Sequence, residues 1–285
     1  MTDLILVTGA GGNIGGPLVS RLVAMGLEIR ILSRDPADKS SAAGTVQVIQ
    51  GDLDRRDTLD RALDGVTRLF ALSPGPDVPL QDANLLSAAE RARVRQVVLL
   101  SSLGAELGGI GGGSQHLPGE VLLRESGLPW TILHPSEFMT NTTWWADSIA
   151  AASAIFVPSG TGRVALIDPT DIAEVAAHVL TTPQQDDGKI YRLTGPEPMT
   201  TADIAAHLTD ILGRSIRHID IPAAEFSAQL LKSGLPPPLV DLQLKYYAAV
   251  KAGTADVVTS DVEQLLSRPA TGYRTWLEQH AALFR

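Results

Sequence analysis

Residues 4–15 read LILVTGAGGNIG, an apolar run that leads into a glycine-rich turn and then into a helical pattern over residues 14–25. The aliphatic run is typical of a strand that is buried on both faces. The spacing of Gly9, Gly12 and Gly15 permits a tight turn, and it lets a ligand approach the N–H groups at the start of the helix. This stretch therefore predicts the pyrophosphate site of a dinucleotide-binding fold.

The same alternation of short apolar runs and amphipathic stretches continues through the first half of the chain. Strand-like runs cover residues 4–8, 28–32, 46–50, 68–72, 96–101 and 130–134, and helical patterns cover 14–25, 57–63, 80–92 and 118–126. Strands that alternate with helices in this way form a parallel sheet with helices on both faces. We therefore expect an α/β fold, a Rossmann-type doubly wound parallel sheet, with ligands at the carboxyl ends of its strands.

The pattern changes after residue 135, where helical stretches begin to dominate. Helices are expected at 141–152, 169–180, 200–212, 223–232, 238–252 and 273–283, and strands at 164–167, 189–193 and 215–221. We expect a dinucleotide-binding domain at residues 1–135, with additions to its sheet and helices from about 164–193. A smaller, mostly helical substrate-binding lobe would then comprise residues 136–163 and 194–285.

Composition narrows the range of functions. The 285 residues carry a formal net charge of −9, which argues against nucleic acid as a partner. The chain has no cysteine, so disulfides, thiolate zinc sites and cysteine nucleophiles are excluded. The six histidines show no ligand-like spacing, and no metal is expected. Without a signal-like N-terminus or an apolar run of membrane-spanning length, we expect a cytoplasmic monomer or homodimer that acts on a small molecule.

Arg34 bears on the choice of cofactor. NAD-specific sites usually carry an acidic residue after the second strand, where this chain has Ser33 and Arg34. A guanidinium there can pair with the 2′-phosphate of NADP, which favours NADPH over NADH. Alternatively, Arg34 is solvated and Asp35 holds the ribose. Asp52 is placed either to contact the adenine or to begin the next helix. The predicted cofactor-binding residues are Thr8, Gly9, Gly11, Gly12, Asn13, Ile14, Gly15, Ser33, Arg34, Asp52, Leu53, Leu72, Ser73, Ser101 and Pro135.

Several further motifs carry a family resemblance. They are GDL at 51–53, LLSS at 99–102, SGLPWTIL at 126–133, FMTN at 138–141 and DIA at 171–173. With the glycine turn, they make nearly the whole chain resemble the NmrA-like group of atypical short-chain dehydrogenases/reductases. The resemblance implies an NAD(P)-binding domain and a small C-terminal lobe that closes a substrate cleft. Some members reduce quinones, azo dyes, iminium or enone-like compounds, whereas others sense the nicotinamide cofactor and regulate transcription without turnover.

The Tyr-x-x-x-Lys pair of ordinary short-chain dehydrogenases is absent from the nucleotide domain, where it must lie. In that pair the lysine lowers the tyrosine pKa, and the tyrosine protonates the substrate carbonyl. No tyrosine precedes Tyr191, and no lysine lies between Lys39 and Lys189. The lysine of isoflavone-reductase-like relatives is missing for the same reason. An alcohol dehydrogenase of the ordinary kind is therefore not expected.

His116, Ser101 and Ser102 are the candidate catalytic residues. His116 and Glu120 are four residues apart and would share a helix face, although Pro118 and Gly119 weaken the helix pattern. His116 is the candidate proton donor, with a structural or exposed histidine as the alternative. Ser101 and Ser102 end the fifth strand, where a hydroxyl can contact either the substrate or a local cap.

One further departure from the family concerns the end of the sixth strand. Family members often have Arg-Pro where this chain has His134-Pro135, which we expect to change the charge at the mouth of the cleft. Because of this difference, the substrates of family members cannot be assigned to this chain directly.

An aromatic substrate pocket is expected after the sixth strand. Its candidate residues are Phe138, Met139, Trp144, Trp145 and Tyr246. An apolar wall suits a flat acceptor that takes hydride directly, such as a quinone, imine, azo compound or activated alkene. The sequence thus favours an NADPH-dependent reductase over an NAD(P)-sensing regulator, and over an epimerase, lyase or coupling auxiliary.

Overall fold

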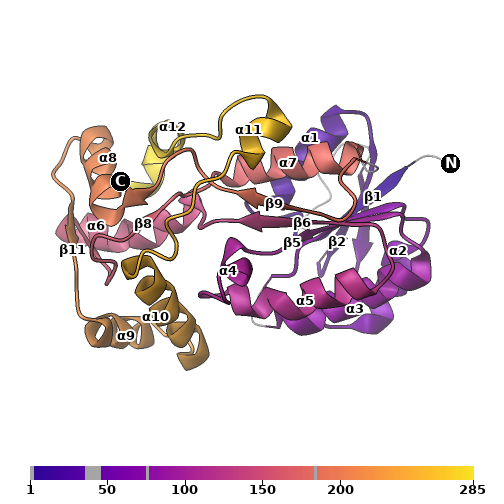
Figure 1. Ribbon diagram of the computed structural model, residues 1–285, viewed down its shortest axis with the longest axis horizontal. Helices are drawn as coiled ribbons and strands as arrows, with labels where there is room; N and C mark the ends of the chain where they lie inside the picture. The colour runs from indigo at the N-terminus through magenta and orange to yellow at the C-terminus, as the bar shows by residue number, and fades with distance from the viewer. Residues whose placement is uncertain (1–2, 36–45, 75–76, 183–184) are drawn as a thin grey trace. The chain divides into compact units, whose positions relative to one another are not determined.

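Two compact units make up the chain. The computed structural model describes residues 3–35, 46–74, 77–182 and 185–285 (Figure 1). The first unit contains Met1–Ser102, Gln115–His134 and Pro169–Arg192, and the second contains Leu103–Ser114, Pro135–Asp168 and Leu193–Arg285. Residues 103–114 and 164–168 thus group with the second unit, whereas the sequence analysis placed them with the dinucleotide-binding domain.

A seven-stranded sheet forms the centre of the first unit. Its strands are β1 (Leu4–Val7), β2 (Glu28–Ser33), β3 (Val46–Gln50), β4 (Arg68–Ala71), β5 (Gln96–Leu100), β6 (Trp130–Pro135) and β9 (Lys189–Leu193). They lie in the order β3-β2-β1-β4-β5-β6-β9, and the first six pair in parallel. The direction of winding reverses between β1 and β4, and ligands bind at such a switch point. The predicted fold class is confirmed.

Helices cover both faces of this sheet. They are α1 (Gly15–Ala24), α2 (Leu59–Leu63), α3 (Val78–Ala92), α5 (Gly113–Glu125) and α7 (Pro169–Thr181), with the 3₁₀ turn η2 (Arg56–Thr58). Helices α1 and α7 lie together on one face, and α2, α3 and α5 lie on the other (Figure 1). Leu18 and Leu22 of α1 are one turn apart and fully buried, which explains why this helix packs on the sheet.

Helix α5 begins earlier than its sequence pattern suggested. The expected start was Pro118, but the helix begins at Gly113 and contains Pro118 in its interior. A proline at this position removes the N–H that would bond to the carbonyl of Ser114. Ser114 is exposed, so solvent can satisfy that carbonyl, and the helix continues through the proline.

The second unit combines short sheets with helices. It contains α4 (Leu103–Glu106), η3 (Met139–Trp145), α6 (Ala146–Ala152), β7 (Ala154–Phe156), β8 (Arg163–Val164), β10 (Met199–Thr200), α8 (Thr201–Leu212), β11 (Arg217–Ile219), α9 (Ala223–Lys232), α10 (Pro237–Lys251), α11 (Asp261–Leu266), α12 (Tyr273–His280) and η4 (Ala281–Phe284). Strand β11 pairs in parallel with β7, and β10 pairs with β8 in antiparallel. The expected strand at 164–167 is therefore shorter, and it is not an addition to the large sheet.

The core of the second unit is aromatic at one end. The rings of Tyr273 and Trp276 are stacked with centroids 5.6 Å apart, and the ring of Phe284 meets Trp276 edge-on at 6.5 Å. All three side chains are about 1% exposed. Thr200 is the N-cap of α8: its hydroxyl accepts from the N–H of Asp203 at 3.1 Å.

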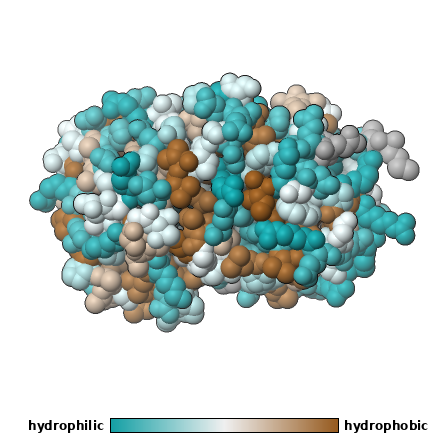
Figure 2. All heavy atoms as spheres, in the orientation of Figure 1, coloured by the Kyte–Doolittle hydropathy of each residue, from teal (hydrophilic) through white to brown (hydrophobic). Residues whose placement is uncertain are grey.

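The surface of the described residues is mixed. On the face shown in Figure 2, apolar residues interrupt a mainly hydrophilic exterior. The exposed large hydrophobic side chains include Leu80, Leu117, Val121, Leu122 and Trp144. None of the helices in the described part of the chain is long and apolar enough to cross a membrane.

Candidate functional site

The glycine turn closes tightly between β1 and α1. Gly9 has a φ of +66°, which an L side chain rarely adopts, and its carbonyl accepts from the N–H of Gly12 at 3.0 Å. A Cβ atom built on Gly15 would lie 2.2 Å from the Gly9 carbonyl oxygen. The first and third glycines are therefore required by the close approach of the turn to the helix.

The N-terminus of α1 is open to an anionic ligand. Its N-cap residue, Ile14, makes no side-chain cap, and Gly11 and Gly12 are exposed. A Cβ on Gly12 would meet only the Gly9 oxygen, at 3.4 Å, so the backbone there can be approached closely. These residues fit the pyrophosphate of a dinucleotide, which would bind to the N–H groups of the turn and the helix start.

Thr8 and Ser73 use their hydroxyl groups inside the protein. The Thr8 hydroxyl donates to the carbonyl of Leu72 at 2.8 Å and accepts from its N–H at 2.7 Å, so it joins the ends of β1 and β4. The Ser73 hydroxyl donates to Asp82 at 2.6 Å. Both residues were predicted to bind the cofactor, and in the structure their hydroxyl groups form these internal hydrogen bonds. The Leu72 side chain packs against Gly9.

Arg34 extends into solvent after β2. Its side chain is exposed and forms no ion pair with the described residues, whereas the Ser33 hydroxyl donates to the carbonyl of Asp35 at 2.8 Å. Residues 36–45, which follow, lie outside the described residues. The position and the free charge of Arg34 are compatible with a phosphate contact.

Asp52 and Leu53 have local structural roles. An Asp52 carboxylate oxygen accepts from the N–H of Asp54 at 3.1 Å, and the N–H of Asp52 donates to the Thr58 hydroxyl at 3.0 Å. These contacts form a turn before η2, whose N-cap is Arg55, so Asp52 does not itself begin the next helix. The Leu53 side chain belongs to the core, so it presents only its backbone to a ligand.

A buried polar cluster occupies the carboxyl ends of β5 and β6. Glu120 of α5 is 2% exposed, and one of its oxygens accepts from the Ser101 hydroxyl and contacts Nε2 of His134 at 2.7 Å. Its other oxygen pairs with Arg124 at 2.7 Å. His134 was expected at the mouth of the cleft, but it is 2% exposed and its ring is held by Glu120.

The cluster keeps Glu120 ionised. Burial alone would raise the pKa of Glu120, but the hydrogen bonds from His134 and Ser101 and the charge of Arg124 outweigh it, so the pKa lies below its usual range. Because the Ser101 hydroxyl donates to Glu120, its proton is engaged. Ser102 is half-buried beside it. Ser101 therefore positions Glu120 in the observed structure.

His116 lies one helical turn before Glu120. Burial lowers the pKa of His116, although the negative charge of Glu120 opposes this effect. The imidazole is therefore neutral at pH 7, and it can donate one N–H hydrogen bond rather than act as a charged acid. A neutral imidazole can still polarise an acceptor oxygen or nitrogen.

Asp82 is an acid that the sequence analysis did not identify. It lies on α3 and is 2% exposed, and its Oδ2 has no hydrogen-bond partner among the described residues. The backbone of Gly119 packs so closely that a Cβ there would lie 2.1 Å from this oxygen. Burial raises the pKa of Asp82 to about 6, and the hydrogen bond from Ser73 only partly opposes the rise.

Asp82 should make stability depend on pH. The folded state holds its proton up to about pH 6, whereas the unfolded state releases it near 3.8, so the free energy of unfolding falls as pH rises through this window. We expect the ionisation of Asp82 to lower the free energy of unfolding by about 3 kcal/mol by pH 7. Asp82→Asn should remove the dependence, and urea unfolding from pH 4 to 7 measures it.

The control for this experiment is Glu90→Gln, which changes an exposed acid on the same helix. It should retain the wild-type slope. Equal slopes for Asp82→Asn and the wild type would show that Asp82 is ionised throughout the window.

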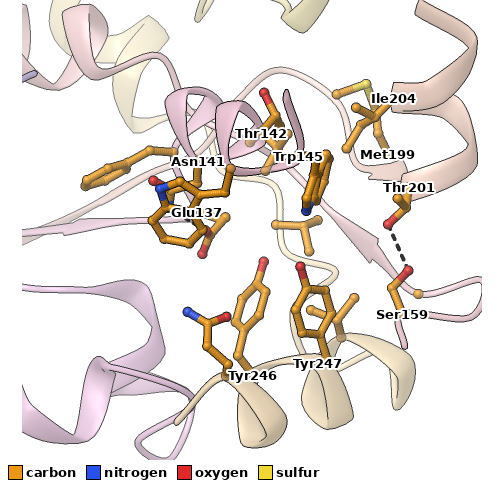
Figure 3. A pocket seen from close by; sticks show the side chains of 17 residues that line it. Glu137, Asn141, Thr142, Trp145, Ser159, Met199, Thr201, Ile204, Tyr246 and Tyr247 are labelled. Carbon is orange, nitrogen blue, oxygen red and sulfur yellow. Dashed lines mark hydrogen bonds between the residues drawn. The ribbon is translucent and has the colours of Figure 1, made fainter. Parts of the chain in front are cut away.

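A pocket lies within the second unit. It has an empty volume of about 520 Å³, part of it open to solvent (Figure 3). Four candidate residues of the expected substrate pocket line it: Phe138, Trp144, Trp145 and Tyr246. Met139 differs from the prediction: it is fully buried in the core and does not line the pocket. Pro135, at the end of β6, is buried. No group of His, Asp and Glu suited to a metal ion occurs in the described residues.

Comparisons with known proteins agree with this architecture. Residues 9–183, more than half of the chain, match the NAD(P)H-binding family model. The (4-alkanoyl-5-oxo-2,5-dihydrofuran-3-yl)methyl phosphate reductase of Streptomyces griseus is 35% identical, and the NAD(P)H azoreductase of Xenophilus azovorans is 32% identical, each with 99% of both chains covered. The solved NADPH-dependent quinone oxidoreductase of Escherichia coli, complexed with NADPH, has a TM-score of 0.88 at 26% identity and covers 98% of this chain and 99% of its own.

The fold and the glycine turn define the class as a Rossmann-type dinucleotide-binding protein. The chain belongs to the NAD(P)H-binding family, among the NmrA-like atypical short-chain dehydrogenases/reductases. Its full-length likeness to named reductases makes it an NAD(P)H-dependent oxidoreductase.

Proposed function

We propose that this protein is an NADPH-dependent reductase of a small, flat acceptor with an activated double bond, such as a quinone, imine, azo compound or alkene. One observation carries the proposal: the chain matches named reductases over its full length, yet its dinucleotide-binding domain has no Tyr-x-x-x-Lys pair, and this spacing occurs only at Tyr247 and Lys251 of α10. An acceptor that takes hydride directly needs no strong acid beside it, because the proton can follow from water.

The residues of the chain would then act mainly by binding and orientation. The turn at Gly9–Gly15 and the start of α1 would hold the pyrophosphate, and Arg34 would hold the 2′-phosphate. Bound NADPH supplies the hydride. The aromatic pocket of the second unit is the candidate surface for the flat acceptor, and neutral His116 of the first unit is the candidate hydrogen-bond donor to a heteroatom that gains electron density. Ionised Glu120, with Ser101 and His134, would position the helix that carries His116.

The test is NADPH oxidation by the purified protein with a panel of quinones, azo dyes, imines and enones, with NADH in parallel. Turnover that is faster with NADPH would support the proposal. Tight NADPH binding without turnover of any acceptor would favour the NAD(P)-sensing alternative.

Arg34→Gln tests the choice of cofactor. A charge-assisted contact with phosphate is worth about 1.5–3 kcal/mol, so we expect NADPH affinity to fall by about tenfold to a hundredfold, with NADH affinity unchanged. Fluorescence titration of both cofactors measures this difference. Arg95→Gln, an exposed arginine before β5, is the control and should change neither affinity. Equal losses for NADPH and NADH would contradict the role of Arg34.

A further inference from the structure

The pocket of the second unit is lined by one acid and by no basic side chain. Glu137 is the sole acidic residue among its lining residues, and no Lys, Arg or His lines it in the described part of the chain. The titratable groups that face the Glu137 carboxyl are Tyr246 and Tyr247 of α10. The charged residues of α10 are exposed and lie outside the lining: Asp241, Lys245 and Lys251. No charged lining residue therefore stabilises the ionised form of Glu137.

Two neighbours hold the carboxyl group of Glu137 in place. Asn141 donates its amide N–H to Oε1 at 2.5 Å, and the Tyr246 hydroxyl, which Figure 3 shows directed toward Glu137, also bonds to the carboxyl. An oxygen that accepts from an amide is the carbonyl oxygen of a protonated carboxyl, so the proton would reside on Oε2. The contacts thus indicate the oxygen from which a proton can leave.

Glu137 is also the lining residue best suited to release a proton. Burial raises the pKa of Glu137, and the hydrogen bonds from Asn141 and Tyr246 only partly oppose the rise. Burial likewise raises the pKa of Tyr246 and of Tyr247, so both phenols keep their protons. His116 of the first unit is neutral and offers a hydrogen bond without an acidic proton. A carboxyl whose pKa is moved toward the working pH is the more effective general acid.

We propose that Glu137 is a catalytic acid that protonates the acceptor bound in this pocket. The inference rests on the proposed function, since it names the source of the proton that accompanies the hydride in that reaction. An uncharged acceptor that gains a hydride must also gain a proton to remain uncharged.

The step balances in atoms and electrons. As the acceptor gains the hydride and its electron pair, the electrons of its double bond move to an oxygen or nitrogen atom. That atom forms a bond to the proton on Oε2, the O–H bond of the carboxyl breaks, and its electrons stay on Glu137 as a carboxylate. Asn141 and Tyr246 then stabilise this carboxylate with their hydrogen bonds. Solvent returns the proton, because the pocket is partly open to it.

The protonation of Glu137 can be measured without turnover. The full-length protein, saturated with NADP⁺ so that no hydride is available, is titrated between about pH 4 and pH 8, and the carboxyl stretch is followed by infrared difference spectroscopy against Glu137→Gln. We expect a midpoint above 4.5, the ordinary value for this group. Tyr246→Phe should move the midpoint further up, because it removes a hydrogen bond that stabilises the carboxylate. A midpoint at or below 4.5 would overturn the proposal.

Glu137→Gln then tests the role in the reaction. The amide keeps the side-chain volume but has no acidic proton, so kcat with a neutral quinone or enone should fall by at least about a hundredfold. NADPH affinity should stay within about threefold of the wild type, which also shows that the variant is folded. The control is Asp241→Asn, which removes an exposed charge from the same helix as Tyr246 and should keep the wild-type rate.

The pH profile separates an acid from a merely structural residue. In the wild type, kcat should fall as pH rises through the pKa of Glu137, because the carboxylate has no proton to give. Glu137→Gln should lack this fall, whereas Asp82→Asn should retain it, although Asp82 titrates near 6. A wild-type kcat that stays constant or rises over this range would overturn the proposal without any variant.

Failure of this inference can be told apart from failure of the proposed function. If Glu137→Gln reduces neutral acceptors within about threefold of the wild type, the reductase stands and the catalytic role of Glu137 is rejected. If the wild type binds NADPH but reduces none of the acceptors, the proposed function is rejected, and the role of Glu137 with it.

Discussion

Replacing Glu120 with alanine is expected to lower the free energy of unfolding by about 2–5 kcal/mol, because it leaves two buried hydrogen-bonding groups without their partner and removes a buried side chain. Ser101 and His134 are 4% and 2% exposed, so both would be left buried without this partner. Arg124 would lose its ion pair, although it can reach solvent. Because domains are stable by only about 5–15 kcal/mol, the variant should unfold at clearly lower urea concentration.

Glu120→Gln refines this prediction. The amide retains the side-chain volume and an oxygen for Ser101 and His134, so we expect a loss of about 1–2 kcal/mol. Glu125→Ala is the matched control, since this exposed residue of the same helix should change stability by less than about 0.5 kcal/mol. A Glu120→Ala protein as stable as the control would contradict the buried network.

Gly15→Ala is expected to weaken NADPH binding by at least about a hundredfold, which corresponds to about 2.8 kcal/mol. The new Cβ would lie 2.2 Å from the oxygen and 2.7 Å from the carbonyl carbon of Gly9. Both are backbone atoms, so no side-chain rotation can relieve the clash, and the turn must open. An opened turn would no longer direct its N–H groups at the pyrophosphate.

Cofactor fluorescence titration measures this effect, and circular dichroism establishes whether the variant is folded. Gly112→Ala is the control: no heavy atom lies within 4 Å of its added Cβ, so it should bind NADPH as the wild type does. A folded Gly15→Ala protein that binds NADPH within about threefold of the wild type would show that the turn is not the phosphate site.

Much of the fold could be predicted from local pattern. Strand β9 (Lys189–Leu193) and helix α9 (Ala223–Lys232) have the bounds that the sequence indicated, because each is a periodic run between clear turn residues. Short elements such as α4 and β7 were missed. Each is three or four residues long, too short for a period to appear. Their formation depends on tertiary contacts.

The candidate site was predicted unevenly. The glycine turn and four of the five pocket residues lie where their positions in the motifs suggested. Thr8, Ser73 and Met139 turned out to support the scaffold rather than present side chains to a ligand. Asp82 and Glu137 carry no motif, and nothing in the local sequence distinguishes them from exposed acids.

The sequence by itself determined the fold class and the turn that receives the cofactor phosphates. Both follow from spacing along one short segment, where glycines and aliphatic residues impose their own backbone geometry. Only the tertiary structure decided that Ser101, Glu120 and His134 meet, because they come from the residue after β5, from α5 and from β6. It likewise decided that Glu137 faces tyrosines of α10 across a pocket. Burial and charge pairing depend on which elements pack together, and that information is spread over the whole chain.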